Sequence, residues 1–543
     1  MGIEDIGNSH PVSVFGCTIC HGGNPDTLNK REAHKGLIGG KNPSDFRFVE
    51  RSCGRTAPNG EPCHSVKVPW FKNHIKRARN SLMSTMAGVI HGILKHWKAK
   101  NTGPFSAIEN RHLPMLPEVK IEPSKATNFE LAIDHFRKLC AKCHTGVEAK
   151  SGTSSHASGC AACHTPYNDR GTYDGLDPTI PRDQFGHPSK HVLTTVIPSR
   201  HCLHCHNRSG REGTSYVGLM ESAFYGTPYV NGTFGAPYLM GGRYMYRMVP
   251  DIHYEKGMHC IDCHTSTEIM GTGEVHTKMY QQLEIRCEDC HGTYTSPPKG
   301  MKVKEGSLAE FTATFNPNYS VEPGDTVGVT SRGTPIPNLK LEKGKWYLYS
   351  KVTGKRYKVP VITGNPRHNF RCQDKLECYS CHSRWAPMCY GCHDILRSGS
   401  QYDYIAKKRK RGRWIERRGF IRFFPFVLGV NHRGKVSPMI FCQSEVFIEA
   451  NGTVRKGPKA FVAAAINPHT TRRVGLTCRQ CHRNRVIMGL GSGIYNSTAS
   501  GIGYPYSPET VVKNGKTIME TEPPGTRGLN TKEIERMLKA PIR

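Results

Sequence analysis

Alternating apolar and polar residues predict two β-rich stretches in this chain. In residues 297–370, the segments EFTATF and KWYLYSKVTGKRYKVPVI alternate around a turn at Thr353-Gly354, which is the pattern of half-buried strands. Residues 403–465 are similar, and Asn451-Gly452 within SEVFIEANGTV indicates a hairpin. By contrast, WFKNHIKRARNSLMSTMAGVIHGILKHW (70–97) is amphipathic at helical spacing and predicts a helix.

The apolar runs are short. The longest, GFIRFFPFVLGV (419–430), is broken by Arg422 and Pro425, so no segment reaches the ~20 apolar residues of a transmembrane helix. Only 37% of the 543 residues are hydrophobic, and Gly and Pro total 92 (56 + 36). This composition predicts a loop-rich chain with little continuous side-chain core, which needs other material to bury its surface against.

The cysteines follow one repeated motif. Of 22 cysteines, 18 form nine CxxC pairs, and a histidine follows every pair; chance would give roughly 0.05 such matches. The pairs are Cys17/Cys20, Cys140/Cys143, Cys160/Cys163, Cys202/Cys205, Cys260/Cys263, Cys287/Cys290, Cys378/Cys381, Cys389/Cys392 and Cys478/Cys481. The histidines are His21, His144, His164, His206, His264, His291, His382, His393 and His482.

The CxxCH motif is typical of c-type haem attachment. Two thiols add to the two vinyl groups of one haem, and the next histidine ligates the iron. Zinc is the alternative, because 16 residues separate Cys143 from Cys160, which suits a zinc ribbon. Zinc gives no reason for a histidine after every pair, so we expect covalently attached haem c, about ten copies in all, to replace much of the missing core.

A tenth site is predicted at CGRTAPNGEPCH (53–64). There Cys53, Cys63 and His64 resemble a CxxCH motif with a loop inserted between its cysteines. A disulfide between Cys53 and Cys63 is the alternative. Two cysteines, Cys372 and Cys442, then lie outside every motif, and an oxidising compartment would favour a disulfide between them.

Eighteen further histidines remain, and fifteen of them are candidates for the sixth iron ligands. The first group is His34, His156, His191, His253, His276, His368 and His469. The second group is His10, His74, His91, His96, His112, His135, His187 and His259. For each of these, an ordinary core or surface histidine remains the alternative.

The motifs and the strand-like stretches divide the chain into six segments. Residues 1–130 carry haems 1–2, a helix and a linker; 131–296 carry five haems; 297–370 are a β-rich insert; 371–395 are a close haem pair; 396–470 are a second β-rich insert; and 471–543 carry the last haem and a C-terminal tail. His382 and His393 are 11 residues apart, so we expect their haems to be near neighbours. A chain of such haems would conduct electrons; haems as structural fillers are the alternative.

The net charge is +31. The run KKRKRGRWIERR (407–418) suits nucleic acid by composition alone. Ten haems would bring about 20 propionates, which the excess Lys and Arg can neutralise. We therefore expect no nucleic-acid partner, and other redox proteins or cytochromes as partners.

Several motifs resemble those of large multihaem c-type cytochromes of anaerobic metal- and sulfate-respiring prokaryotes. The similar segments are HASGCAACHTPY, MHCIDCHTSTEIMG, EIRCEDCHG and WAPMCYGCH. The resemblance implies bis-histidine haems and electron transfer in the periplasm or at the cell surface. It gives the expected fold class, a multihaem cytochrome c that is loop-rich, with short α-helices around a haem chain and two small β-rich insertions.

The same resemblance leaves two other functions open. One is a reductase or oxidase of a nitrogen or sulfur oxyanion with an open haem at His64, although the CxxCK site of cytochrome c nitrite reductases is missing. The other is a subunit that polymerises into an extracellular filament. Haem attachment takes place outside the cytoplasm, and the start MGIEDIGNSHPVSVFGC lacks the features of a signal peptide. We therefore expect an exported protein whose sequence here is the mature form; a start assigned differently from that of the gene is the alternative.

Overall fold

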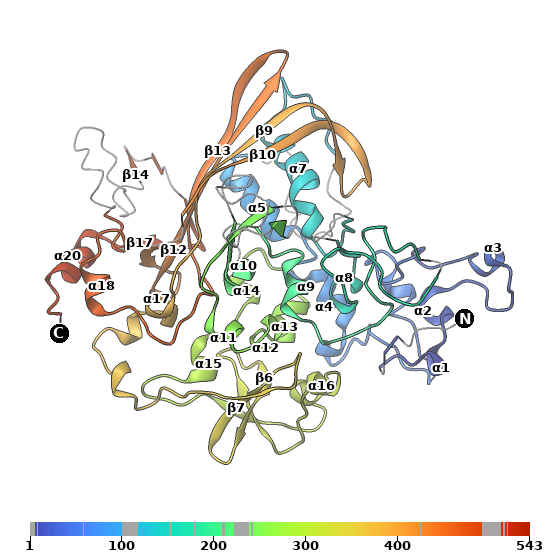
Figure 1. Cartoon of the computed structure of the whole chain (residues 1–543), viewed down its shortest axis with the longest axis horizontal. Helices are drawn as coiled ribbons and strands as arrows, with labels where there is room; N and C mark the ends of the chain where they lie inside the picture. The colour runs from blue at the N-terminus through green and yellow to red at the C-terminus, as the bar shows by residue number, and fades with distance from the viewer. Residues whose placement is uncertain are drawn as a thin grey trace.

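The chain is described by a computed structural model over residues 6–7, 9–57, 59–99, 118–150, 155–178, 180–208, 212–221, 238–239, 243–422, 426–490, 512–513, 516–517 and 520–542. In Figure 1 the N-terminal helices lie at one end of the molecule, and α18 and α20 lie at the other. The α-helices are α1 (Val12–Phe15), α2 (Thr18–His21), α3 (Lys30–Ala33), α4 (His74–Asn80), α5 (Ala87–His96), α7 (Asn128–His135), α8 (Ala161–His164), α9 (Ser199–Leu203), α10 (Glu212–Tyr216), α11 (Ile252–Glu255), α12 (Cys260–Cys263), α13 (Ser266–Met270), α14 (Met279–Gln282), α15 (Cys287–His291), α16 (Leu308–Thr314), α17 (Cys378–His382), α18 (Cys478–His482) and α20 (Thr531–Lys539).

Shorter helical turns connect these helices. They are the 3-10 turns η1 (Val49–Arg51), η2 (Trp70–Lys72), η5 (Ala141–Cys143), η8 (Pro366–His368) and η9 (Gln373–Lys375), and the π-helix η4 (Phe136–Cys140). The helix predicted over 70–97 is present in three pieces, η2, α4 and α5. Residues 100–117, most of the predicted linker, lie outside the described residues.

The first β-rich stretch forms an antiparallel sheet of five strands in chain order. Its strands are β4 (Gly300–Lys302), β5 (Thr326–Val329), β6 (Pro335–Glu342), β7 (Lys345–Tyr349) and β8 (Arg356–Lys358). The predicted turn at Thr353-Gly354 lies between β7 and β8, where Gly354 has a φ of 70° and its N–H donates to the Ser350 carbonyl at 3.0 Å. The alternation in KWYLYSKVTGKRYKVPVI therefore predicted β7 and β8 correctly. The strand predicted at EFTATF (310–315) is wrong, because Glu310–Thr314 belong to helix α16, which begins where the Ser307 side chain accepts from Glu310 N–H.

A seven-stranded mixed sheet is the largest element. It contains β9 (Met388–Asp403), β10 (Lys408–Arg422), β11 (Val427–Val430), β12 (Val436–Ala450), β13 (Thr453–Ala465), β16 (Glu520–Glu522) and β17 (Arg527–Gly528). The path is β10-β9-β12-β11-β17, with β13 on β12 and β16 on β13; β12 runs parallel to β9, and β16 parallel to β13. The predicted hairpin at Asn451-Gly452 joins β12 to β13, with positive φ at both residues.

Two small sheets complete the described strands. β1 (Leu219–Glu221) and β2 (Tyr238–Leu239) both pair with β3 (Arg243–Arg247). β14 (Val512–Lys513) pairs with β15 (Lys516–Thr517).

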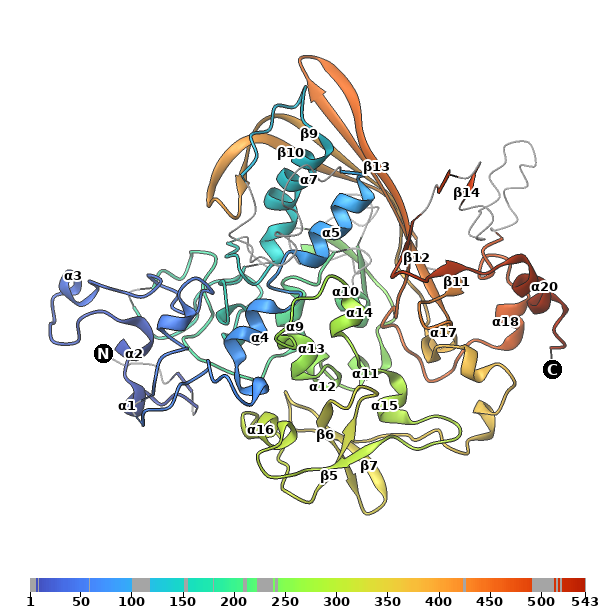
Figure 2. The same cartoon turned by 180° about the vertical axis from the view of Figure 1, so that it is seen from behind.

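Helices α5 and α7 pack beneath the arch of the large sheet (Figures 1 and 2). Leu131 and Phe136 from the helical side and Leu396 and Val446 from the strands are fully buried in one cluster. A capping box starts α7, because the Thr127 hydroxyl accepts from Glu130 N–H and the Glu130 carboxylate accepts from Thr127 N–H. Side chains alone form this apolar core.

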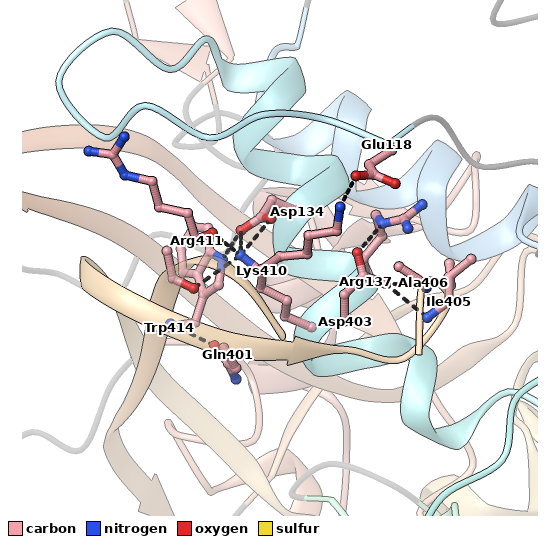
Figure 3. A network of polar contacts seen from close by, with 12 residues as sticks. Glu118, Asp134, Arg137, Gln401, Asp403, Ile405, Ala406, Lys410, Arg411 and Trp414 are labelled. Atoms are coloured by element: carbon pink, nitrogen blue, oxygen red, sulfur yellow. Dashed lines mark hydrogen bonds and ion pairs between the residues drawn. The ribbon is translucent and has the colours of Figure 1, made fainter. Parts of the chain in front are cut away.

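Buried polar contacts fasten α7 and η4 to the β9–β10 hairpin (Figure 3). The Trp414 indole Nε1 donates to Asp134 Oδ2 at 2.8 Å, and Arg137 Nε donates to Asp403 Oδ2 at 2.6 Å. Lys138 Nζ pairs with Asp134 at 2.8 Å and is fully buried. The segment that leads into the Cys140 motif is thus fixed to the sheet.

The predicted fold class is wrong. We expected short helices around a haem chain and two small β-rich insertions, but the second β region is the seven-stranded mixed sheet. It extends from Met388 to Gly528, across the predicted segment boundaries at 395/396 and 470/471. The first half of β9 was not predicted because residues 389–393 form a CxxCH motif within the predicted haem pair 371–395, and the other motifs of this kind favour a helical turn.

Candidate functional site

Most CxxCH motifs lie in short helical turns. Motif residues form or flank α2, α8, α9, α12, α15, α17 and α18, while the Cys140 motif enters η5 directly from η4. Residues three and four apart in a helix are on the same side, so the two thiols and the following histidine point in one direction. A capping box at Thr477 and Gln480 begins the last of these turns. This geometry suits attachment of one haem by each motif.

These helices follow one another across the molecule in chain order. Figures 1 and 2 show α2, α9, α12, α15, α17 and α18 in a succession that starts at the N-terminal end and finishes beside α20. The sequence predicted the motifs but gave no information on this order in space.

Thiols of different motifs are neighbours along this succession. Cys205 raises the pKa of the Cys143 thiol, Cys260 raises that of Cys202 and Cys378 raises that of Cys287, and burial adds to each rise. Further along, burial raises the pKa of Cys481 to about 12, and the neighbouring Cys381 adds to the rise. Neighbouring motifs from Cys140 to Cys481 are therefore close enough for their thiols to interact.

The N-terminal motifs continue the same row. Burial raises the pKa of Cys20 to about 11, and the charges of Cys53 and Cys63 add to the rise. Burial also raises the pKa of Cys160, again with a contribution from Cys53. The predicted site at 53–64 thus lies between the first motif and the motif of α8.

One cavity of about 3660 Å³ runs along the row. Pockets for a single small molecule occupy about 300–1,000 Å³, so this cavity has room for several large cofactors. Thiols from seven motifs line it: Cys140, Cys143, Cys163, Cys202, Cys205, Cys260, Cys263, Cys287, Cys290, Cys378, Cys381, Cys478 and Cys481. Its size and its thiols fit haem.

Five motif histidines each have another histidine ring nearby. The distances between ring centroids are 5.9 Å for His21–His191, 5.4 Å for His64–His74, 6.3 Å for His264–His469, 6.1 Å for His291–His253 and 6.1 Å for His382–His368. A metal ion between two imidazoles, with each nitrogen about 2 Å away, separates the ring centres by about 6 Å. The spacing of these pairs fits a shared iron.

Several of these histidines have a fixed orientation. The Nδ1 atoms of His164, His291 and His382 lie 2.9, 2.8 and 2.9 Å from backbone carbonyl oxygens, and His482 Nδ1 lies 2.9 Å from the Met537 carbonyl. A carbonyl accepts only from a protonated Nδ1, so the Nε2 lone pair remains for a metal. His469 Nδ1 has the same arrangement at 3.0 Å from the Asn467 carbonyl.

Acidic groups orient two more. His264 Nδ1 lies 3.1 Å from Glu268 Oε2, and His253 Nδ1 lies 2.7 Å from Asp251 Oδ1. Burial alone would lower the pKa of His264, but the Glu268 carboxylate holds it above the ordinary value. A carboxylate behind a ligating imidazole also raises its basicity as a ligand.

Other predicted ligands have Nε2 engaged elsewhere. His156 Nε2 lies 2.7 Å from the Lys142 carbonyl, His276 Nε2 lies 2.8 Å from Thr272 Oγ1, and His135 Nε2 lies 3.1 Å from Asp394 Oδ2. The structure therefore does not present these three histidines for metal binding, although His156 and His276 belong to the first group of predicted ligands and His135 to the second.

The remaining candidates are scattered. His34 is exposed at the end of α3, and His187 is half-buried, with its pKa lowered by burial and by Lys41 and Lys150. His259 Nδ1 accepts from Ser199 N–H at 3.2 Å. His96 lies at the end of α5 and lines the cavity. The side chain of His91 and all of His112 lie outside the described residues.

The site at 53–64 closes as a hairpin. Thr56 and Pro62 form a β-bridge, and His64 N–H donates to the Cys53 carbonyl at 3.1 Å, so the inserted loop brings Cys53 and His64 together. The centroid of the His64 ring lies 5.9 Å from that of His10 and 5.4 Å from that of His74. Burial, followed by the His10 charge, lowers the pKa of His64 to about 4, which keeps the ring neutral as a ligand must be.

The motif 389–393 differs from the rest because it lies within strand β9. The side chains of residues 388–392 lie outside the described residues. His393 is exposed, and its ring centroid lies 5.5 Å from that of Phe447 on the adjacent strand β12. Trp385 and Ala386, which lie between this motif and the motif 378–382, are buried.

Two further observations concern residues that the sequence misjudged. Cys372 carries a free thiol, so the predicted disulfide to Cys442 is not formed. His201 and His204 were not among the predicted ligands, yet both are buried and line the cavity. The sequence indicates these two histidines only by their position, because His201 precedes Cys202 and His204 lies between Cys202 and Cys205.

Comparison of the chain with protein-family models, curated proteins and solved structures finds no match. Within the described ranges, every helix is too short or too polar to cross a bilayer.

Proposed function

We propose that this protein transfers electrons through about ten covalently attached haems held by its CxxCH motifs and by Cys53, Cys63 and His64. The observation that carries the proposal is the cavity of about 3660 Å³ that is lined by thiols of seven motifs. A bound haem supplies a one-electron Fe(III)/Fe(II) couple at each site.

The protein's own groups would fix each site. Paired cysteines would anchor the cofactor, and the motif histidine would keep Nε2 for the iron because Nδ1 donates to the protein, as in His291 and His382. A second histidine opposite, such as His253 or His368, would complete a bis-histidine site. Sites closed on both sides favour electron transfer over substrate binding.

The alternative of a catalytic haem at His64 receives less support. An open site needs one free face, but His74 and His10 both lie beside His64, with ring centroids 5.4 and 5.9 Å away. Two candidate sixth ligands at this position favour a closed site. We therefore propose an electron carrier rather than a reductase or oxidase.

The place of action and the partners follow from the chemistry. Covalent haem attachment takes place outside the cytoplasm, so we propose a periplasmic or extracellular protein that exchanges electrons with other redox proteins. The excess of Lys and Arg would neutralise haem propionates.

Intact-mass measurement and absorption spectra of the purified holoprotein test the proposal. We expect a mass increase of ten haems and a low-spin spectrum. In the variant His368→Ala one site should become high-spin, whereas the control His276→Ala should keep the parent spectrum because its Nε2 faces Thr272. A colourless protein, or zinc in place of iron, would refute the proposal.

A further inference from the structure

The last motif turn, α18, carries an exposed cluster of arginines. Arg479 lies between the two cysteines of the motif, and Arg483 and Arg485 follow it; all three are exposed. Together with Gln480 and Asn484 they line a surface hollow of about 530 Å³. A molecule bound there would be next to the last site of the row.

The chain segment that contains this turn has basic residues but no acidic ones. Residues 450–508 contain eight Lys and Arg and no Asp or Glu. At the opposite end, residues 9–41 around the first motif mix four basic residues with two acidic ones, and Lys35 pairs with Glu32 at 2.6 Å. The two ends of the row therefore differ in charge as well as in position (Figure 1).

An exposed apolar side chain lies on the helix that contacts the arginines. Leu538 of α20 is 42% exposed, and Arg483 Nη1 donates to the Leu538 carbonyl. Arginine next to apolar surface is characteristic of protein interfaces, whereas a site for a small ion needs no exposed apolar rim.

We propose that the surface formed by Arg479, Arg483, Arg485 and Leu538 is the docking face for an acidic redox protein that exchanges electrons with the last haem. This inference rests on the proposed electron-transfer function and adds the place and the charge of the partner. Guanidinium groups bind carboxylates in bidentate fashion, and complementary charge steers a short-lived complex to this end of the row.

Stopped-flow reduction of the holoprotein by an acidic [2Fe–2S] ferredoxin tests the proposal. In each encounter one electron leaves the reduced iron–sulfur cluster and reduces one haem iron. The variant Arg479→Gln/Arg485→Gln should slow the second-order rate about fivefold at low ionic strength, and much less at high ionic strength. Lys30→Gln/Arg31→Gln is the matched control, because it removes the same charge from exposed residues at the other end.

The outcomes separate this proposal from the function on which it rests. Haem content and low-spin spectra of both variants should equal those of the parent; a parent without haem would refute the proposed function instead. Should Arg479→Gln impair haem attachment, Arg485→Gln alone, outside the motif, should still slow the reaction. Equal slowing in both double variants, or no slowing, would overturn the docking face. Oxidation of the reduced holoprotein by the small anion ferricyanide is a second assay. If the arginine variant slows this reaction but not the reaction with ferredoxin, the arginines bind small anions, and the proposed docking face is wrong.

Discussion

Replacing Lys138 by methionine should destabilise the protein strongly. The Lys138 ammonium is 0% exposed, and its partner Asp134 is 4% exposed at 2.8 Å. Lys138 Nζ also donates to the carbonyls of Arg411 and Gly412, where the β9–β10 pairing shifts register. The bulge leaves these carbonyls outside the strand ladder, and the ammonium satisfies them.

The expected cost follows from what the substitution leaves behind. Methionine has similar length and no donor, so the Asp134 carboxylate would stay buried with the Trp414 indole, 2.8 Å away, as its remaining partner. Removing one partner of a buried ion pair costs about 3–5 kcal/mol. The double variant Asp134→Asn/Lys138→Met keeps an acceptor for Trp414 and removes the uncompensated charge, so it should recover most of that loss.

Urea unfolding of the holoprotein, followed by far-ultraviolet circular dichroism, measures both effects. We expect the single variant to lose about 3–5 kcal/mol and the double variant about 1–2 kcal/mol. A single variant within about 1 kcal/mol of the parent would show that Lys138 is not the buried partner of Asp134. A double variant as unstable as the single one would locate the cost in the two carbonyls instead.

Two further predictions concern the cofactor count and a backbone contact. Cys53→Ser/Cys63→Ser should lower the intact mass by one haem, whereas Cys372→Ser should leave it unchanged; an unchanged mass in the first variant would favour the disulfide interpretation of 53–64. Gly159→Ala should lower the melting temperature markedly, because φ is +72° and a Cβ would lie 1.9 Å from a backbone oxygen. Gly60 also has a positive φ, +87°, but open space around it, so Gly60→Ala should lower the free energy of unfolding by only about 1–2 kcal/mol. If both variants lower the melting temperature equally, the predicted clash at Gly159 is wrong.

The sequence predicted structure well where the signal is local. Asn451-Gly452 specified its hairpin because two residues with positive φ suffice to reverse the strand. The parallel pairing of β9 with β12 and of β13 with β16 has no such signal, since it joins segments that are distant in the chain. The large sheet was therefore missed as a whole, although part of its strand content was expected.

The histidines show the same limit at the candidate site. His469 lies beside His264, although strands β4 to β13 lie between them in the chain. The separation of a histidine from the nearest cysteine in the sequence therefore could not predict which histidines pair. His156 stands four residues before Cys160 and yet has both ring nitrogens beside carbonyl oxygens. Only the folded chain separates these two cases.

The protein's apolar clusters and its thiol-lined cavity occupy different places. Leu131, Phe136, Leu396 and Val446 pack under the sheet, whereas the cavity of about 3660 Å³ follows the motif turns. Protein interiors are close-packed, and the proposed haems would account for a cavity several times larger than a small-molecule pocket. Histidines whose Nδ1 donates to the protein, such as His291 and His382, present Nε2 as a lone-pair donor. In the proposed holoprotein the sheet and helices would form the walls of this space, and the motif turns would supply the iron ligands.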